Sequence, residues 1–351
     1  MVASVRLRFL TSTPLDIARG SGTYVGMYVL AGALESLGHS VEFETPRVHL
    51  PIYTAERLLF NHRLRRAPEF DVSVGFDMDG YRVADVAALK GVIADEVRFE
   101  SGLTRLTMGI QARCERRHVH RARQVLVTSR YAGAQATGLY GLTCAPVVVP
   151  ELIDLAEWRN WLERHPASSS RFTVLFVGRL YRRKRVDVLL RAAAEARQRI
   201  PELEVRVVGN GPRGSALKAL ARDLRLENTV TWLNDVSRAA LAEEYNRSSA
   251  FCLPSVQEGF GIVLLEAMAA RRPILGARAA AIPEVAPHAL LVEPENPEAL
   301  AAAMEALYRS PDACSAQVAA GADWVEQFDA PRVAQQFLDA IRVPRPTCAL
   351  A

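Results

Sequence analysis

Short runs of β-branched and aromatic residues alternate with longer amphipathic segments along the whole chain. In the first half, the strand-like runs lie near residues 5–10, 41–45, 71–75, 86–92, 124–128 and 146–149. In the second half, they lie near residues 172–177, 204–208, 229–233, 250–253, 273–276 and 289–292. Segments with helical periodicity separate most of these runs, for example 23–37, 185–198 and 213–225. This alternation is typical of parallel α/β sheets, and we therefore predict a doubly wound α/β fold.

The length of the chain and one serine-rich segment indicate two domains. A chain of 351 residues exceeds the size at which a single hydrophobic core stops growing. The segment His165–Ser170 contains a proline and three serines, which is typical of a linker. We predict an N-terminal Rossmann-like domain at residues 1–165 and a C-terminal one at residues 166–328. Pro331 interrupts a helical segment, and we expect the helix at about 329–342 to pack back on the first domain.

Composition argues against several classes of function. The net charge of +4 is too small to indicate a nucleic-acid partner. No apolar run approaches the ~20 residues of a membrane span, and the N-terminus lacks the pattern of a signal peptide, so we expect a cytoplasmic protein. The five cysteines form no C-x-x-C pair, and His118 and His120 would lie on different faces of a helix. We therefore predict no metal site and no bound cofactor. The preference for arginine over lysine is typical of a GC-rich bacterial gene.

The strongest motif is the segment Glu258–Met268, which follows the strand-like run AFCLP. Gly259 and Gly261 allow the backbone to approach a ligand closely. The free amides of the helix that begins near Ile262 would then face the same place, as in many phosphate sites. Glu258 and Glu266 flank this turn, and carboxylates accept hydrogen bonds from hydroxyl-rich ligands such as a sugar or a ribose. The alternative is a solvated loop glutamate and a helix-starting glutamate that complements the helix dipole.

A second motif is the segment Phe176–Asp187, in which a buried strand ends at Gly178. Arg179 follows the glycine directly, and Lys184 stands at the expected start of a helix. Two cations beside a helix N-terminus suit an anion such as a diphosphate leaving group. A merely basic loop would explain Arg182 but not an arginine placed directly after the strand.

Together these segments resemble glycosyltransferase family 4 of the GT-B fold. The pattern GRLxxxKxxDxLLxA is followed by GNGP at Gly209–Pro212 and then by ExxxxxxxE, in the family's order and spacing. The first domain is similar only in Gly20-Ser21-Gly22 before a helix, and in short segments around Thr128 and Val149.

The resemblance implies a metal-independent, retaining transfer of a sugar from a UDP- or GDP-linked donor to an acceptor. By resemblance, Arg179 and Lys184 hold the diphosphate, Glu258 holds the donor sugar and Glu266 holds the ribose. The remaining donor-binding residues implied are Gly22, Gly178, Leu233, Gly259, Phe260, Gly261, Ile262 and Val263. Arg179, Lys184 and Glu258 are the implied catalytic residues.

The chain departs from the family on the acceptor side. Lys90 stands where the family often has a histidine, and Asp77 aligns with an aspartate whose neighbouring histidines are absent. We assign both residues to the acceptor side. The family's Gly-Gly-x-Pro-Glu turn appears as Ala280-Ala281-Ile282-Pro283-Glu284.

Four alternatives stay open. Gly20, Gly22 and Gly26 followed by Glu44 resemble a dinucleotide fingerprint, although the spacing is one residue too long. The basic segment 57–66 is either a membrane-surface helix, which would place the protein at the inner face of the membrane, or an ordinary helix packed on a sheet. An epimerase acting on the nucleotide sugar alone and a silent nucleotide-sugar-binding protein are the other two functions considered.

Overall fold

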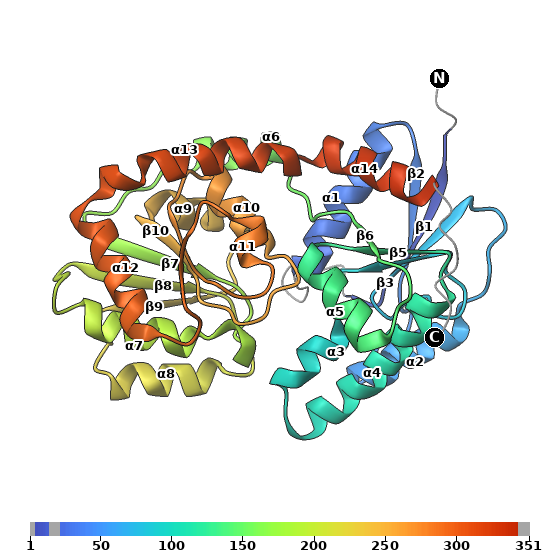
Figure 1. Ribbon diagram of the computed structural model, residues 1–351, viewed down its shortest axis with the longest axis horizontal. Coiled ribbons are helices and arrows are strands. Elements are labelled where there is room, and N and C mark those ends of the chain that lie inside the picture. The colour runs from blue at the N-terminus through green and yellow to red at the C-terminus, as the bar shows by residue number, and fades with distance from the viewer. Residues whose placement is uncertain (1–3, 14–21, 343–351) are drawn as a thin grey trace. The chain divides into compact units, whose positions relative to one another are not determined.

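The computed structural model describes residues 4–13 and 22–342. The chain divides into two compact units, drawn in Figure 1. The first consists of Met1–Leu152 together with Ala330–Ala351, and the second of Ile153–Asp329. Each unit contains one six-stranded sheet in which all neighbouring strands are parallel, so the predicted α/β fold class is confirmed.

The sheet of the first unit has the strand order β2-β1-β3-β4-β5-β6. Its strands are β1 (Arg6–Leu10), β2 (Ser40–Glu44), β3 (Val72–Phe76), β4 (Val86–Leu89), β5 (Gln124–Val127) and β6 (Val147–Val148). Its helices are α1 (Gly22–Ser36), α2 (Tyr53–Arg63), α3 (Ile93–Glu96), α4 (Gly102–Arg121), α5 (Arg130–Tyr140) and α14 (Ala330–Arg342), with a 3-10 turn at Val97–Phe99. The predicted strand at 86–92 ends earlier, at Leu89, because the Lys90 amide donates to Asp77 Oδ1 and not to a neighbouring strand.

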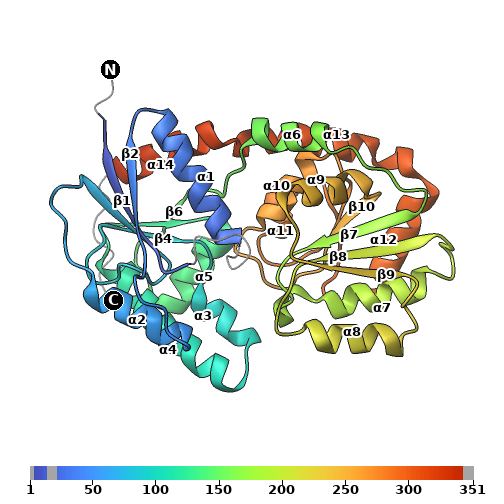
Figure 2. The same cartoon turned by 180° about the vertical axis from the view of Figure 1, so that it is seen from behind.

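Aromatic rings from three elements form the core on one face of this sheet. Phe9 of β1 packs edge-to-face on Phe76 of β3, with ring centroids 5.0 Å apart. Phe337 of α14 packs on the same Phe9 ring at 6.1 Å. Pro331 stands in the first turn of α14, where a missing N–H costs no helical hydrogen bond. The chain therefore returns to the first unit as a new helix that packs on α1, as Figure 2 shows.

The sheet of the second unit has the strand order β12-β11-β10-β7-β8-β9. Its strands are β7 (Phe172–Val177), β8 (Leu203–Val208), β9 (Val230–Asn234), β10 (Ala250–Leu253), β11 (Ile274–Ala277) and β12 (Leu290–Val292). Its helices are α6 (Leu155–Arg164), α7 (Val186–Ala196), α8 (Gly214–Asp223), α9 (Arg238–Arg247), α10 (Ile262–Ala269), α11 (Ile282–Val285), α12 (Pro297–Arg309) and α13 (Ser315–Trp324). Three 3-10 turns lie at Arg182–Lys184, Pro311–Cys314 and Val325–Phe328. The strand order reverses between β7 and β10, which is where ligands of such sheets bind.

The boundary between the units lies at Leu152, before the predicted linker at His165–Ser170. The reason is that α6 packs into the second unit: Trp158 is completely buried there, and its indole N–H donates to the Glu266 carbonyl at 3.2 Å. The end of α6 is also held in this unit, because the Asn246 side chain donates to the carbonyls of Leu162 and His165.

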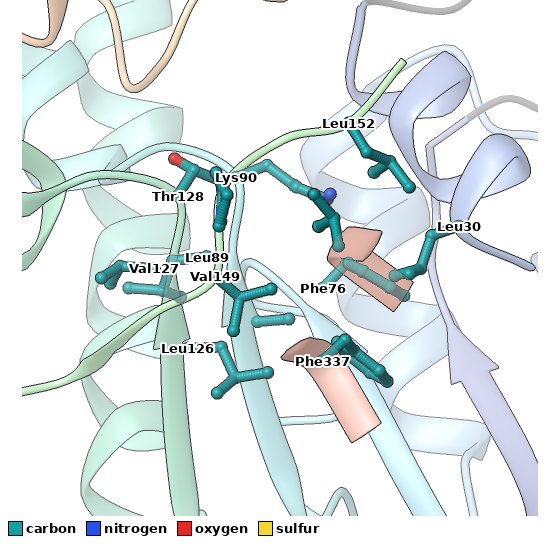
Figure 3. Close-up of a pocket in the computed structure, with 13 residues that line it drawn as sticks. Leu30, Phe76, Leu89, Lys90, Leu126, Val127, Thr128, Val149, Leu152 and Phe337 are labelled. Atoms are coloured by element: carbon teal, nitrogen blue, oxygen red, sulfur yellow. The ribbon is translucent and has the colours of Figure 1, made fainter. Parts of the chain in front are cut away.

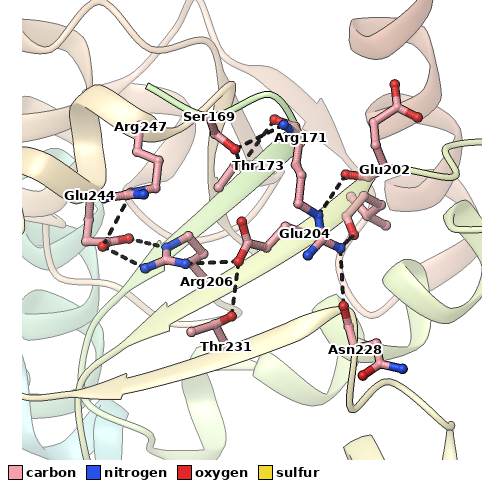
Figure 4. A network of polar contacts seen from close by, with 11 residues as sticks. Ser169, Arg171, Thr173, Glu202, Glu204, Arg206, Asn228, Thr231, Glu244 and Arg247 are labelled. Atoms are coloured by element: carbon pink, nitrogen blue, oxygen red, sulfur yellow. Dashed lines mark hydrogen bonds and ion pairs between the residues drawn. The ribbon is translucent and has the colours of Figure 1, made fainter. Parts of the chain in front are cut away.

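A buried polar network ties α9 to the sheet of the second unit (Figure 4). Arg206 of β8 donates to both carboxylate oxygens of Glu244 on α9, and also to Glu204 at 2.9 Å. Glu204 accepts a further bond from Thr231 of β9. Nearby, Arg171 donates to backbone carbonyls at the start of β8 and before β9, including Leu203 O at 2.8 Å. Because each charge has a partner, these contacts fix the position of α9 on the sheet.

Candidate functional site

The loops after β7 and β8 pack backbone against backbone. The Gly178 N–H donates to the Val208 carbonyl, and the Leu180 N–H donates to the Asn210 carbonyl. A Cβ on Gly209 would lie 2.2 Å from the Gly178 oxygen, so only glycine fits at this contact. Gly209 and Gly178 also have positive φ angles of 119° and 155°. The glycines of GNGP therefore allow the loop after β8 to pack closely against the Arg179–Lys184 loop after β7.

The loop after β10 is bound to the loop after β7. Lys184 Nζ forms an ion pair with Glu258 Oε1, and both side chains are largely buried. Arg183 adds two bonds: its Nε donates to Gln257 Oε1 at 2.8 Å, and its carbonyl accepts from the Val256 N–H at 2.9 Å. The structure thus brings together two residues that the sequence motifs placed 74 positions apart. They meet where the strand order of the sheet reverses.

Helix α10 begins beside this pair. Gly261 caps the helix in a left-handed conformation with φ 92°, so the first amides of α10 have no side-chain cap. The Ala281 N–H donates to the Glu258 carbonyl at 3.3 Å. Ala280 has a positive φ of 53°, which is unfavourable for alanine and explains why the family pattern has a glycine in this turn.

Arg179 differs from Lys184 in its surroundings. It is partly exposed and, among residues 4–13 and 22–342, its side chain has no acidic partner. Its carbonyl accepts the Tyr181 N–H at 2.8 Å, which turns the chain towards the 3-10 turn Arg182–Lys184. An arginine in this position is available for an anion, since its guanidinium is not neutralised within the described chain.

Glu266 lies in a buried cluster with residues of α6 and α9. Its Oε1 accepts a bond from Arg238 at 2.8 Å, and its Oε2 accepts one from the Tyr245 hydroxyl at 3.1 Å. The Arg238 guanidinium lies 4.5 Å from the centre of the Trp158 ring. Burial, followed by the charge of Glu266, raises the pKa of Tyr245 well above 10, so this hydroxyl remains a hydrogen-bond donor. Glu258 and Glu266, which the motif presents as a pair, thus have separate partners.

The other predicted donor residues have these positions. Gly22 begins α1, whereas Gly20 and Ser21 lie outside the described residues. Leu233 is the second-last residue of strand β9 and precedes Asn234, which has a positive φ of 53°. Phe260 is buried and packs edge-to-face on Phe328 at 5.5 Å. The Phe260 side chain is therefore not available to a ligand. Gly259, Ile262 and Val263 lie in the turn and at the start of α10.

In the first unit, a tight turn follows β3 at Asp77–Gly80. Asp77 has a positive φ of 52°, a conformation that non-glycine residues rarely adopt. Its carboxylate accepts the Lys90 N–H at 2.9 Å, and its carbonyl accepts a bond from His118 Nδ1 at 2.7 Å. Burial raises the pKa of Asp77 to about 6, against the opposing effect of Arg57. Burial also lowers the pKa of His118 to about 4, so this histidine is neutral.

The side chain of Asp79 holds the same turn in place. Its carboxylate accepts bonds from Ser12 and Asn61 and pairs with Arg57 at 3.0 Å. Arg57 is therefore buried inside the unit.

The segment 57–66 does not form one basic face, because α2 ends at Arg63 and Arg57 points inward. This favours the alternative of a helix packed on the sheet. Among the described residues, no helix has the length and apolar character required to cross a membrane.

Lys90 forms an ion pair that the sequence did not predict. Its Nζ donates to Glu151 Oε2 at 2.9 Å, and the two side chains are only 9% and 6% exposed. The ammonium also lies 5.6 Å from the centre of the Phe76 ring. Figure 3 shows Lys90 at the edge of a narrow pocket lined by apolar side chains, among them Leu30, Val149 and Phe337. Asp77 and Lys90 do lie together, as predicted, but the lysine charge is already neutralised.

Three residues in these contacts were missed by sequence reasoning: Glu151, Arg238 and Tyr245. Glu151 follows the Val149-Pro150 segment, and Arg238 stands at the start of a helix, but neither belongs to a motif. Their partners, Lys90 and Glu266, could be recognised from the sequence. The one available signal for the missed residues was a complementary charge near the end of a predicted strand.

The remaining alternatives find little support. Gly22 begins α1, Gly26 lies one turn further along the helix, and Glu44 pairs with Arg8. Gly20, the first glycine of the dinucleotide fingerprint, lies outside the described residues. His118 and His120 bond to different carbonyls, those of Asp77 and Tyr140.

Comparison with known proteins covers part of the sequence and most of the fold. Residues 159–324 match the family model of glycosyl transferases group 1. A D-inositol 3-phosphate glycosyltransferase of Pseudarthrobacter chlorophenolicus is 31% identical over 210 residues, which cover 56% of this chain and 50% of that protein. The chain spans about half the length of the curated relatives it matches.

Solved structures match almost the whole chain. Sucrose-phosphate synthase from Thermosynechococcus elongatus has a TM-score of 0.77 at 18% identity, covering 96% of this chain and 98% of that one. HepE of Anabaena, solved in complex with UDP and glucose, has a TM-score of 0.71 at 17% identity, covering 97% and 100%. These likenesses establish the GT-B fold. Residues 159–324 are therefore similar to glycosyl transferases group 1, and the chain has the GT-B fold.

Proposed function

We propose that this protein transfers a sugar from a UDP- or GDP-linked donor to an acceptor hydroxyl, with retention of configuration and without a metal ion. The observation that carries the proposal is the Lys184–Glu258 pair at the point where the strand order of the second sheet reverses. A cation and a carboxylate at this position suit the two ends of the reacting bond: the diphosphate and the sugar.

The charges account for the chemistry without a divalent cation. As the glycosidic bond breaks, negative charge develops on the diphosphate, and Arg179 and Lys184 would stabilise it. The Lys184 ammonium is paired with Glu258. On donor binding, the phosphate would replace Glu258 as the partner of Lys184, and the Glu258 carboxylate would accept hydrogen bonds from sugar hydroxyls. The donor is then bound through both ends at once.

Two observations guide the choice of substrates. HepE was solved with UDP and glucose, which makes UDP-glucose the first donor to test. The curated relatives are named D-inositol 3-phosphate glycosyltransferases, which makes inositol 3-phosphate the first acceptor. On the acceptor side, Asp77 is the carboxyl best suited to accept a hydrogen bond from the acceptor hydroxyl. Its raised pKa and strained backbone are features of functional residues.

The test begins with the donor alone. A transferase should hydrolyse UDP-glucose slowly until an acceptor is added, and the product formed with an acceptor should retain the anomeric configuration of the donor by NMR. EDTA should leave the rate within about twofold. Conversion of the donor to an epimer without acceptor would indicate the epimerase alternative, and binding without any turnover would indicate a silent binding protein. Strict dependence on magnesium or manganese would contradict the metal-free mechanism.

A further inference from the structure

We propose that Arg238 and Tyr245 are positioning residues that hold the Glu266 carboxylate for a ribose, so that the donor must be a ribonucleotide and not a 2′-deoxyribonucleotide. This inference rests on the proposed nucleotide-sugar site and adds a specificity to it. Neither Arg238 nor Tyr245 belongs to the motifs that identify the site.

The carboxylate of Glu266 is held at both oxygens. Arg238 donates to Oε1 at 2.8 Å. The Tyr245 hydroxyl, which also lies 3.2 Å from the Val263 carbonyl, donates to Oε2 at 3.1 Å, so the carboxylate cannot rotate without losing one bond. A carboxylate has about four acceptor positions, and two of them are used here. One acceptor position therefore remains on each oxygen. Two neighbouring acceptors match the two hydroxyl donors of a vicinal diol, which ribose has and 2′-deoxyribose lacks.

The two donors are themselves held rigidly. Trp158 is completely buried between them: its ring stacks on the Arg238 guanidinium at 4.5 Å and meets the Tyr245 ring edge-to-face at 5.6 Å. Its indole N–H also donates to the backbone of Glu266. Glu244, the residue before Tyr245, is fixed by Arg206 of β8, as Figure 4 shows. The cluster is therefore preorganised by α6, α9 and the sheet together.

The cluster is also accessible from one side. The Arg238 side chain is 22% exposed, whereas the Glu266 side chain is 7% exposed. Arg238 is the first residue of α9, and it follows the loop after β9 in which Leu233 is expected to border the base. A nucleotide whose base lies at this loop would place its ribose next to the open side of the cluster.

Loss of one ribose hydroxyl leaves a buried acceptor unpaired. Such a loss weakens binding more than the removal of a solvated hydrogen bond, because the acceptor has already given up water. We expect wild-type protein to bind UDP about tenfold or more tightly than 2′-deoxy-UDP, and GDP likewise against 2′-deoxy-GDP.

The test is calorimetry with these four nucleotides on wild type, Arg238→Gln, Arg238→Lys, Tyr245→Phe and Glu266→Gln. Arg238→Gln should weaken UDP about tenfold and reduce the preference over 2′-deoxy-UDP to about threefold or less, with Arg238→Lys in between. In the Glu266→Gln background, Arg238→Gln should have almost no further effect, because Arg238 acts through Glu266. Arg222→Gln, an exposed residue in the last turn of α8 in the same unit, is the control and should keep the wild-type preference.

The outcomes separate the two proposals. If wild type binds none of the four nucleotides, the proposed function itself fails. If it binds them but Arg238→Gln and Tyr245→Phe, shown to be folded by thermal melting, keep the full preference for ribose, the positioning role is wrong. An equal loss for ribo- and deoxyribonucleotides that persists in the Glu266→Gln background would mean that Arg238 contacts the ligand directly, which also overturns the inference.

Discussion

Two lysine–glutamate ion pairs stand at the carboxyl ends of the two sheets, and their surroundings differ. Lys184 lies in the loop after β7, which also contains Arg179, and Glu258 lies in the loop after β10. Helix α10 begins four residues after Glu258 and has no side-chain cap. Lys90 is paired with Glu151, and its ammonium lies over the ring of Phe76 at the edge of an apolar pocket. The lysine in each pair is neutralised by its partner.

The two pairs differ in whether another anion can replace the glutamate as the partner of the lysine. Around Lys184, the helix amides and Arg179, which has no acidic partner in the part of the chain that the structure describes, favour a second anion, so the pair is suited to exchange Glu258 for a phosphate. Around Lys90, the apolar side chains give a displaced charge no compensation. The comparison teaches that the same two residue types lie next to a helix N-terminus and a further cation in one unit, and in closed, apolar surroundings in the other.

The largest effect is expected from breaking the closed pair. Lys90→Ala leaves Glu151 buried without a partner, and should lower the free energy of unfolding by about 3–5 kcal/mol. Because the pair is structural, nucleotide affinity should remain nearly unchanged. Urea denaturation and calorimetry measure both quantities. A double variant, Lys90→Met with Glu151→Gln, should recover most of the stability, and a failure to recover it would show that the pair is not the cause.

The next effect concerns the surroundings of the Lys184–Glu258 pair. Arg179→Ala and Lys184→Ala should each slow transfer by about a hundredfold or more, because each removes a preorganised positive charge that stabilises the leaving group. Their effect on turnover should exceed their effect on donor affinity. Steady-state kinetics with the identified donor measures this, with Lys218→Ala as a control lysine in the same unit. A loss confined to KM would place these cations in binding alone.

A smaller effect should separate the two glutamates of the motif. Glu266→Gln should weaken UDP and the intact donor alike, by roughly 1.5–3 kcal/mol for a charge-assisted hydrogen bond. Glu258→Gln should spare the bare nucleotide and reduce donor affinity and turnover, because its carboxylate is expected at the sugar. Calorimetry with UDP and with UDP-glucose compares them. Equal losses of UDP affinity in both variants would show that the split assignment is wrong.

The smallest effect is a pH dependence near the closed pair. The pKa of Asp77 is raised to about 6 in the folded protein, so the stability linked to this carboxyl is full below pH ~4 and is lost as pH rises through about 6. Asp77→Asn removes this loss and tolerates the left-handed backbone. The variant should match wild type near pH 4 and melt roughly 2–4 °C higher at pH 7.5, for about 1 kcal/mol after solvent screening. An unchanged difference in Tm from pH 4 to 7.5 would mean that Asp77 does not titrate in this range.

The same cluster contains a group with the opposite dependence. The pKa of His118 is lowered to about 4, so its contribution to stability is lost as pH falls from about 6.5 to 4. The difference between Asp77→Asn and wild type at each pH removes this common background. It therefore isolates the titration of the carboxyl.

Local patterns determined the elements and the loops of the donor side. All twelve predicted strands are present, because each is a short apolar run whose periodicity depends only on its own residues. The positions of Gly178, Gly209 and Gly261 were also predictable in kind, since each has a positive φ that a local turn requires. The end of α6 shows the limit of this approach, because a linker-like composition at His165–Ser170 did not mark the boundary between the units.

Only the tertiary structure decided which charges are paired. Lys184 meets Glu258 across 74 residues, Lys90 meets Glu151 across 61, and Arg238 meets Glu266 across 28. Such pairs depend on which strands are neighbours and on which helix covers which face, and these are properties of the whole unit. The sequence by itself therefore determined a parallel α/β chain with motifs that resemble glycosyltransferase family 4. The structure decided that Lys184 is paired with Glu258, that Lys90 is paired with Glu151, and that Glu266 is held by an arginine and a tyrosine outside every motif.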